Sequence, residues 1–154
     1  MGIEIERKFL VGNDAWKAFA DEGRVCRQGY LCSGDGKTVR VRTMGGQAFL
    51  TIKGPTQGIS RTEFEYGIPV ADAEVLLALC GSLVEKTRFL VAHAGMQWEL
   101  DVFSGENAGL VMAEIELETE DQEIDLPGWV GEEVSGDARY YNASLAKHPF
   151  SSWC

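Results

Sequence analysis

The chain has 154 residues, 45% of them hydrophobic and 25% charged, which is the composition of one ordinary globular domain over residues 1–154. Its formal net charge of −10 argues against a nucleic-acid partner, because such binding depends on an overall basic surface. There is no run of 18 apolar residues and no apolar leader at the N-terminus, so we expect a cytoplasmic protein without a membrane partner.

Cysteine and histidine give no sign of a metal site. The four cysteines are Cys26, Cys32, Cys80 and Cys154. They form no CxxC pair, so we expect reduced thiols rather than disulfides or a zinc centre. His93 and His148 are isolated in the sequence, and neither is assigned a role as ligand or base.

Alternating apolar and polar residues predict eight β-strands, joined mostly as hairpins. Their approximate ranges are 2–11, 24–32, 37–44, 47–53, 59–68, 83–93, 96–103 and 109–119. Three helices are expected over about residues 14–22, 71–80 and 139–147, while 121–137 is expected to be loop. The second helix follows Pro69 and would turn Val75, Leu76 and Leu79 toward the core.

Charged residues stand two apart in most of these strands and therefore share one face of the sheet. In the first strand Glu4, Glu6 and Lys8 alternate with apolar residues. A helix would place residues two apart roughly 200° from each other, so it would not gather these charges. Because helices are available to cover the apolar face, we predict a mainly β fold. This fold is an eight-stranded antiparallel barrel, or tunnel, with a charged lumen and helices packed on its outside.

The charged face carries more than one kind of chemistry. The pairs Glu4/Glu6 and Glu114/Glu116 offer hard oxygen ligands for Mg²⁺ or Mn²⁺, and burying them without a cation would be costly. The bases of this face are Lys8, Arg40, Arg42, Lys53, Arg61, Lys86 and Arg88. They outnumber what pairing with these acids requires, and surplus ammonium and guanidinium groups beside a metal suit a phosphate chain.

The order of these residues along the chain resembles the CYTH domain, also called the triphosphate tunnel metalloenzyme superfamily. Residues 4–8 match its ExExK signature. The match continues through Arg40-Val41-Arg42, Lys53, Arg61–Glu65, Lys86-Thr87-Arg88 and Glu114-Ile115-Glu116. Gln28–Leu31 and Arg139–Asn142 resemble the short bacterial members. The similarity covers nearly the whole chain.

The resemblance implies a role for each matched residue. Glu4, Glu6, Glu114 and Glu116 would hold Mg²⁺ or Mn²⁺, and the bases named above would bind a small-molecule triphosphate. Lys8, Tyr30 and Arg88 are the catalytic candidates, with Glu63, Glu65 and Asp101 as additional site residues. A homodimer is compatible with the sequence.

The leading interpretation of function is an inorganic triphosphatase that cleaves tripolyphosphate to pyrophosphate and phosphate. The alternatives are a nucleoside or thiamine triphosphatase, a class IV type adenylate cyclase, and a non-catalytic polyphosphate- or nucleotide-binding module. An aromatic clamp for a base or a thiamine ring would have to come from Trp98, Phe103 or Trp129.

Overall fold

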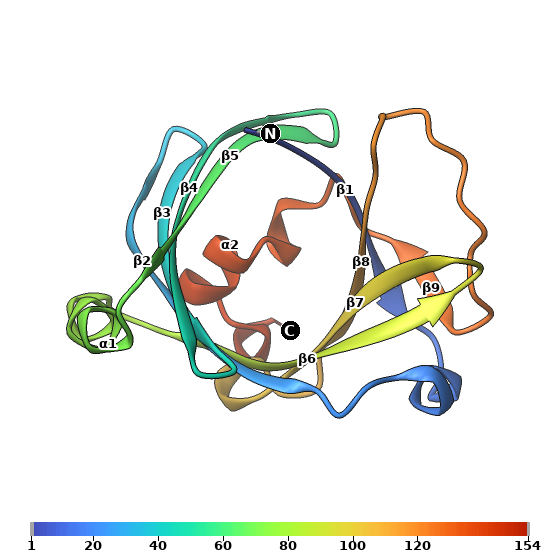
Figure 1. The fold of residues 1–154 in the computed structure, drawn as a ribbon, viewed down its shortest axis with the longest axis horizontal. Helices are drawn as coiled ribbons and strands as arrows, with labels where there is room; N and C mark the ends of the chain where they lie inside the picture. The colour runs from blue at the N-terminus through green and yellow to red at the C-terminus, as the bar shows by residue number, and fades with distance from the viewer. Residues whose placement is uncertain (1, 154) are drawn as a thin grey trace.

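A computed structural model describes residues 2–153 and contains one antiparallel sheet that closes on itself. The barrel strands are β1 (Ile3–Val11), β2 (Arg24–Gly34), β3 (Lys37–Met44), β4 (Gln47–Gln57), β5 (Ser60–Ile68), β6 (Val84–His93), β7 (Met96–Phe103) and β8 (Val111–Glu116). They follow the order β5-β4-β3-β2-β6-β7-β8-β1, and β1 also pairs with β5 to complete the ring (Figure 1). The predicted eight-stranded antiparallel barrel is confirmed.

Tight turns at the hairpins set the register that keeps the charges on the inner face. Asp35 and Gly36, between β2 and β3, both have positive φ (53° and 77°), as a type I′ turn requires. The same geometry recurs at Gly45-Gly46 between β3 and β4. In β4 the register shifts between Lys53 and Thr56, where Pro55 cannot donate a ladder hydrogen bond.

The helix α1 (Val70–Leu79) packs on the outside of β2, β3 and β4, as predicted (Figure 1). Its buried residues are Ala73 and Leu77, which contact Val41 and Ala48 on the outer face of the barrel. The predicted inward side of this helix is wrong at two positions, because Val75 is 66% and Leu79 is 71% exposed. The small Ala73 allows the close approach to the sheet that a stripe of large residues would prevent.

The C-terminal helix expected at about residues 139–147 forms α2 (Asn142–Lys147). It was predicted to pack on the outside of the barrel, and this prediction is wrong. Looking along the barrel, α2 appears inside the ring of strands (Figure 1). Leu145 of α2 packs with Val84, Phe103 and Met112 of β6, β7 and β8, and Tyr140 lies against the same cluster. The C-terminal segment therefore closes part of one end of the barrel with an apolar plug.

The remaining differences lie between the strands. A 3₁₀-helix η1 (Ala15–Phe19) replaces the longer helix expected there, and it buries only Trp16. Within the stretch expected to be loop, β9 (Val130–Glu133) pairs with β1 outside the ring. Short 3₁₀-helices η2 (Gly105–Asn107), η3 (Ala138–Tyr140) and η4 (Phe150–Ser152) complete the described elements.

No helix in the part of the chain that the structure describes has the length and apolar character needed to cross a membrane. Cys26, Cys32 and Cys80 are free thiols, as expected, and Cys154 lies outside the described residues.

Candidate active site

The lumen holds a cavity of about 710 Å³. Of the residues predicted for the site, all but one line it: Glu4, Glu6, Lys8, Tyr30, Arg40, Arg42, Lys53, Arg61, Glu63, Glu65, Lys86, Arg88, Glu114 and Glu116. They come from seven different strands, so the closure of the barrel is what brings them together. The exception is Asp101, which lies behind two of the bases.

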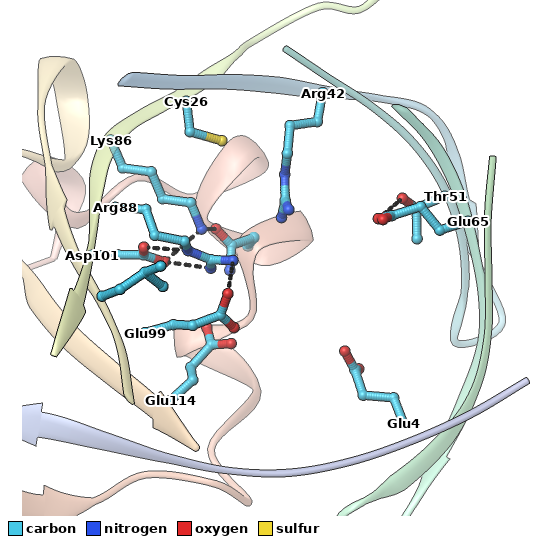
Figure 2. Close-up of polar contacts among 12 residues, drawn as sticks. Glu4, Cys26, Arg42, Thr51, Glu65, Lys86, Arg88, Glu99, Asp101 and Glu114 are labelled. Carbon is cyan, nitrogen blue, oxygen red and sulfur yellow. Dashed lines mark hydrogen bonds and ion pairs between the residues drawn. The ribbon is translucent and has the colours of Figure 1, made fainter. Parts of the chain in front are cut away.

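Asp101 anchors the bases on the wall formed by β6 and β7. Its Oδ2 accepts hydrogen bonds from Lys86 Nζ at 2.6 Å and from Arg88 Nη2 at 2.9 Å, and its Oδ1 accepts one from Arg88 Nε at 2.8 Å (Figure 2). Burial would raise the pKa of Asp101, but Arg88 and Lys86 outweigh it and lower that pKa to about 2. Arg88 also donates to Glu99, which leaves its guanidinium rigidly held at the cavity surface.

Lys86 has little freedom to bind a ligand directly. Its side chain is fully buried, and its ammonium is shared between Asp101 and Asn142 Oδ1, the latter at 3.1 Å. Burial lowers the pKa of Lys86, and the charges of Arg88 and Arg42 lower it further against the effect of Asp101. Two of the three N–H donors of Lys86 are thus committed within the wall, which leaves one for a phosphate.

Lys8 lies on β1, in register with Glu114 of the neighbouring strand β8. Its ammonium is 3.8 Å from Glu114 Oε1 and donates to the carbonyl of Tyr140 at 3.4 Å. Burial opposes the charge on Lys8, but Glu114 and Glu6 outweigh it and raise its pKa. The phenol of Tyr30 also raises the pKa of Lys8.

The candidate metal-binding carboxylates differ in their electrostatic state. Burial raises the pKa of Glu6 well above its usual range, and the neighbouring Glu114 raises it further. For Glu114 burial acts in the same direction, but Lys8 and Arg88 hold its pKa well below that range. Within residues 2–153 Glu6 therefore forms no ion pair, although Lys8 lowers its pKa, while Glu114 is paired with Lys8 and lies in the field of Arg88.

The opposite wall, formed by β3, β4 and β5, carries Arg40 and Arg42. Arg40 Nη2 donates to Thr51 Oγ1 at 3.2 Å and lies 3.7 Å from Glu65 Oε2. Its buried Nε has no hydrogen-bond partner among residues 2–153. A buried donor without a partner is costly unless a ligand satisfies it, so Arg40 is well suited to an anion in the cavity.

Two polar residues outside the predicted set complete the site. Arg42 Nε donates to Gln28 Oε1 at 3.0 Å, and Gln28 Nε2 donates to Asn142 Oδ1 at 3.1 Å. Asn142 begins α2, which was expected outside the barrel, so its position in the lumen could not be predicted from strand parity. His148 and Lys147 also line the cavity from α2 and its end, for the same reason.

Comparison with known proteins identifies this arrangement. The model of the CYTH domain matches residues 2–148. The chain belongs to the CYTH domain family. An inorganic triphosphatase of Acetivibrio thermocellus is 48% identical over 155 residues, covering 99% of both chains. An inorganic triphosphatase of Nitrosomonas europaea is 41% identical over 152 residues, covering 93% of this chain and 96% of the relative.

A solved structure agrees with these relatives. The crystal structure of an inorganic triphosphatase matches this CYTH domain with a TM-score of 0.67 and 38% sequence identity, covering 93% of each chain.

Membership of the CYTH family, that of the triphosphate tunnel metalloenzymes, implies a divalent metal. No three His, Cys, Asp or Glu side chains among the described residues stand close enough to form a ready-made site. The donor chemistry nevertheless fits, because four carboxylates offer hard oxygens and Glu6, whose pKa is raised by loss of solvent, forms no ion pair with any of residues 2–153. Assembling a metal site requires Glu4 to leave Lys53, to which it is now bound.

Proposed function

We propose that this CYTH domain is a metal-dependent hydrolase that cleaves inorganic tripolyphosphate to pyrophosphate and phosphate. The observation that carries the proposal is the composition of the lumen, where the seven predicted bases surround a cavity that also contains four candidate metal-binding carboxylates. The three relatives named above, each an inorganic triphosphatase, support the same substrate for this chain.

The phosphate chain is proposed to lie between the two basic walls. Arg40 has an unpartnered Nε that would donate to a non-bridging oxygen, and Arg88 is held by Asp101 with its guanidinium at the cavity surface. Rigid donors aimed at the transferring phosphoryl group stabilise the charge that develops on it in the transition state. Lys8 lies beside Glu6 and Glu114, so we assign it the contact nearest to the scissile bond.

Glu4, Glu6, Glu114 and Glu116 are the residues proposed to hold Mg²⁺ or Mn²⁺. When bound, such an ion neutralises phosphate charge and lowers the pKa of a coordinated water from 15.7 toward about 7. Tyr30, whose hydroxyl accepts from Gln28 Nε2 at 3.5 Å, is proposed to orient Lys8 rather than to react itself. Arg61 donates to the carbonyls of Gly54 and Gly36, so its proposed role is to fix the cavity wall as well as to attract the anion.

The other triphosphate chemistries fit the site less well. A cyclase or a thiamine triphosphatase must also hold a ring, but Trp98, Phe103 and Trp129 are nearly fully buried in apolar clusters and do not line the cavity. Tyr30 and Tyr141 are the aromatic residues that do, and both are engaged with lumen residues. A non-catalytic module would need the bases but not the four carboxylates.

Release of phosphate from a panel of substrates tests the proposal. Tripolyphosphate, ATP, thiamine triphosphate and pyrophosphate would be compared with Mg²⁺ and with Mn²⁺. We expect kcat/KM for tripolyphosphate to exceed that for the nucleotide and for thiamine triphosphate. Faster turnover of either ring-bearing substrate, or formation of cyclic AMP from ATP, would contradict the assignment.

A further inference from the structure

The side chain of Asn142 joins the C-terminal helix to both walls of the cavity. Its single carbonyl oxygen accepts a hydrogen bond from Gln28 Nε2 on β2 and another from Lys86 Nζ on β6, each at 3.1 Å. Both donors belong to strands of the barrel, whereas Asn142 is the first residue of α2. One amide oxygen thus connects three elements that meet where the plug enters the lumen.

The directions of the hydrogen bonds from Lys86 through Asn142 and Gln28 to Arg42 are fixed by the chemistry of the two end groups. An ammonium group donates and never accepts, so Lys86 requires the oxygen of Asn142. Gln28 must then present its nitrogen to that same oxygen, which turns its own carbonyl toward Arg42. The guanidinium of Arg42 also only donates, so the chain of hydrogen bonds is consistent from end to end.

The residues of this network are buried, so an acceptor lost from it would not be replaced easily. Gln28 is 0% and Lys86 is 1% exposed. A second N–H of Lys86 goes to Asp101, with the ring centroid of Phe103 5.5 Å from the ammonium. Without Asn142, one N–H of Lys86 and one of Gln28 would lose their acceptor, and each side chain would be held at one point fewer, Lys86 by Asp101 and Gln28 by Arg42.

We propose that Asn142 is a positioning residue for the phosphate chain, holding Lys86 directly and Arg42 through Gln28 in the arrangement that the anion meets. This inference rests on the proposed triphosphatase function and adds to it that the C-terminal plug sets the geometry of the basic walls. Asn142 also lines the cavity, but its carbonyl oxygen is occupied by these two donors and an oxygen acceptor does not attract a phosphate. We therefore assign its effect on activity to the position of the bases.

Replacing Asn142 with alanine is the direct test. Misplaced bases would bind the phosphates less well in the ground state and the transition state alike, so KM for tripolyphosphate should rise about tenfold while kcat changes little.

The matched control is Asn107→Ala. Asn107 is also a buried asparagine, and its Oδ1 accepts from the backbone N–H of Phe150, so it fastens the same C-terminal segment without reaching the lumen. This control should keep its KM.

A double-mutant cycle separates positioning from loosening of the plug. If Asn142 acts through Gln28, then Asn142→Ala and Gln28→Ala together should raise KM by clearly less than the product of the two single effects. The proposal would be overturned if Asn107→Ala and Asn142→Ala raised KM equally. It would also be overturned if the effects of Asn142→Ala and Gln28→Ala on KM were independent, so that the double variant showed their product. If the Asn142→Ala protein does not fold, Asn142→Ser replaces it, because the short serine side chain cannot reach both donors. The same outcomes then apply.

Binding of tripolyphosphate in EDTA, measured by calorimetry, distinguishes this inference from the proposed function. We expect Asn142→Ala to weaken binding about tenfold and Asn107→Ala to leave it unchanged. A wild-type protein that binds tripolyphosphate but does not hydrolyse it would refute the function, and the ratio of Kd values would still decide the role of Asn142. A wild-type protein that binds no polyphosphate at all would overturn both.

Discussion

Lys53 donates hydrogen bonds to both carboxylate oxygens of Glu4, at 2.9 and 3.2 Å, although β5 separates their strands in the sheet. Lys53 is also 3.3 Å from Glu63 Oε2. Burial raises the pKa of Glu4, and the carboxylate of Glu63 adds to this effect while Lys53 opposes it. The ammonium of Lys53 thus stands where a metal bound by Glu4 would also be favoured, and the two cations compete for one carboxylate.

Lys53→Ala tests this competition. The variant should show a KM for tripolyphosphate about tenfold higher, because a base near the anion is lost, and it should reach half-maximal activity at a lower metal concentration. Steady-state kinetics at varied Mg²⁺ and Mn²⁺ measure both effects. Lys17→Ala removes an exposed lysine that contacts Asp14 and the ring of Trp16 and does not line the cavity, so it should change neither value. An unchanged metal requirement in Lys53→Ala would contradict the competition.

Lys8 and Arg40 should differ in their kinetic effects. Lys8 lies beside Glu6 and Glu114, so Lys8→Ala should mainly lower kcat, by roughly 10²-fold. Arg40 contacts Thr51 and Glu65, neither of which is a leading metal-ligand candidate, so Arg40→Ala should mainly raise KM. Both variants would be compared on tripolyphosphate. A Lys8→Ala protein with normal kcat and altered KM would show that the division of roles is wrong.

Strand parity was sufficient to predict which side chains meet in the lumen. Residues two apart on a strand share a face whatever the details of packing, so Glu4, Arg40, Lys86 and Glu116 could be assigned to the lumen before the fold was known. The register follows from hairpin turns whose residues can be recognised in the sequence, such as Asp35-Gly36.

The C-terminal part of the site could not be predicted in the same way. A six-residue helix such as α2 has too few turns for its periodicity to say which surface it buries. Leu145 would serve equally well against the outside of the barrel or in its end. The position of Asn142 depends on that choice, and on contacts with residues more than 50 positions away in the sequence. Likewise, the inner face of α1 was misjudged because alanine gives little hydrophobic signal.

Removal of the metal should affect both activity and stability. Activity should disappear in EDTA and return with Mg²⁺ or Mn²⁺, and Glu4→Gln and Glu116→Gln should lose most of their turnover while remaining folded. Glu6 is different, because its pKa is raised in the folded state. A raised pKa means that the folded protein favours protonated Glu6, so the charged form destabilises it at pH values above the ordinary range of a glutamate.

Glu6→Gln should therefore raise the Tm of the protein in EDTA at pH 8 while abolishing most of its activity. The increase in Tm on adding metal should be smaller in the variant than in the wild type, since ligand binding stabilises only the form that binds. Thermal unfolding with and without Mn²⁺ measures both quantities. A variant that is less stable than wild type in EDTA would show that Glu6 is held by an attractive contact instead.

Asp101 should make the stability of the barrel depend on pH in the opposite sense. Its pKa is about 2 in the folded protein, below the ordinary value of 3.8, so its ionised form is favoured by folding. This stabilisation is fully present above pH 4 and is lost as the pH falls toward 2, with a size of about 2 kcal/mol. Asp101→Asn should remove it and also leave Lys86 buried without a counter-charge and Arg88 paired with Glu99 alone, so the loss at pH 7 should reach about 3–5 kcal/mol.

Urea unfolding of wild type and Asp101→Asn at pH 7, 5 and 3 checks this expectation. The difference in the free energy of unfolding between the two proteins should be constant from pH 7 to 5 and should decrease at pH 3, where the Asp101 carboxylate of the unfolded wild-type chain is protonated while that of the folded protein is still mostly ionised. Asp137→Asn is the matched control, because Asp137 also pairs with an arginine, Arg139, but at the surface, where solvent screens the charges. Its effect should be much smaller at every pH. Equal destabilisation by the two substitutions would mean that burial of Asp101 between Lys86 and Arg88 adds nothing to the stability of the barrel.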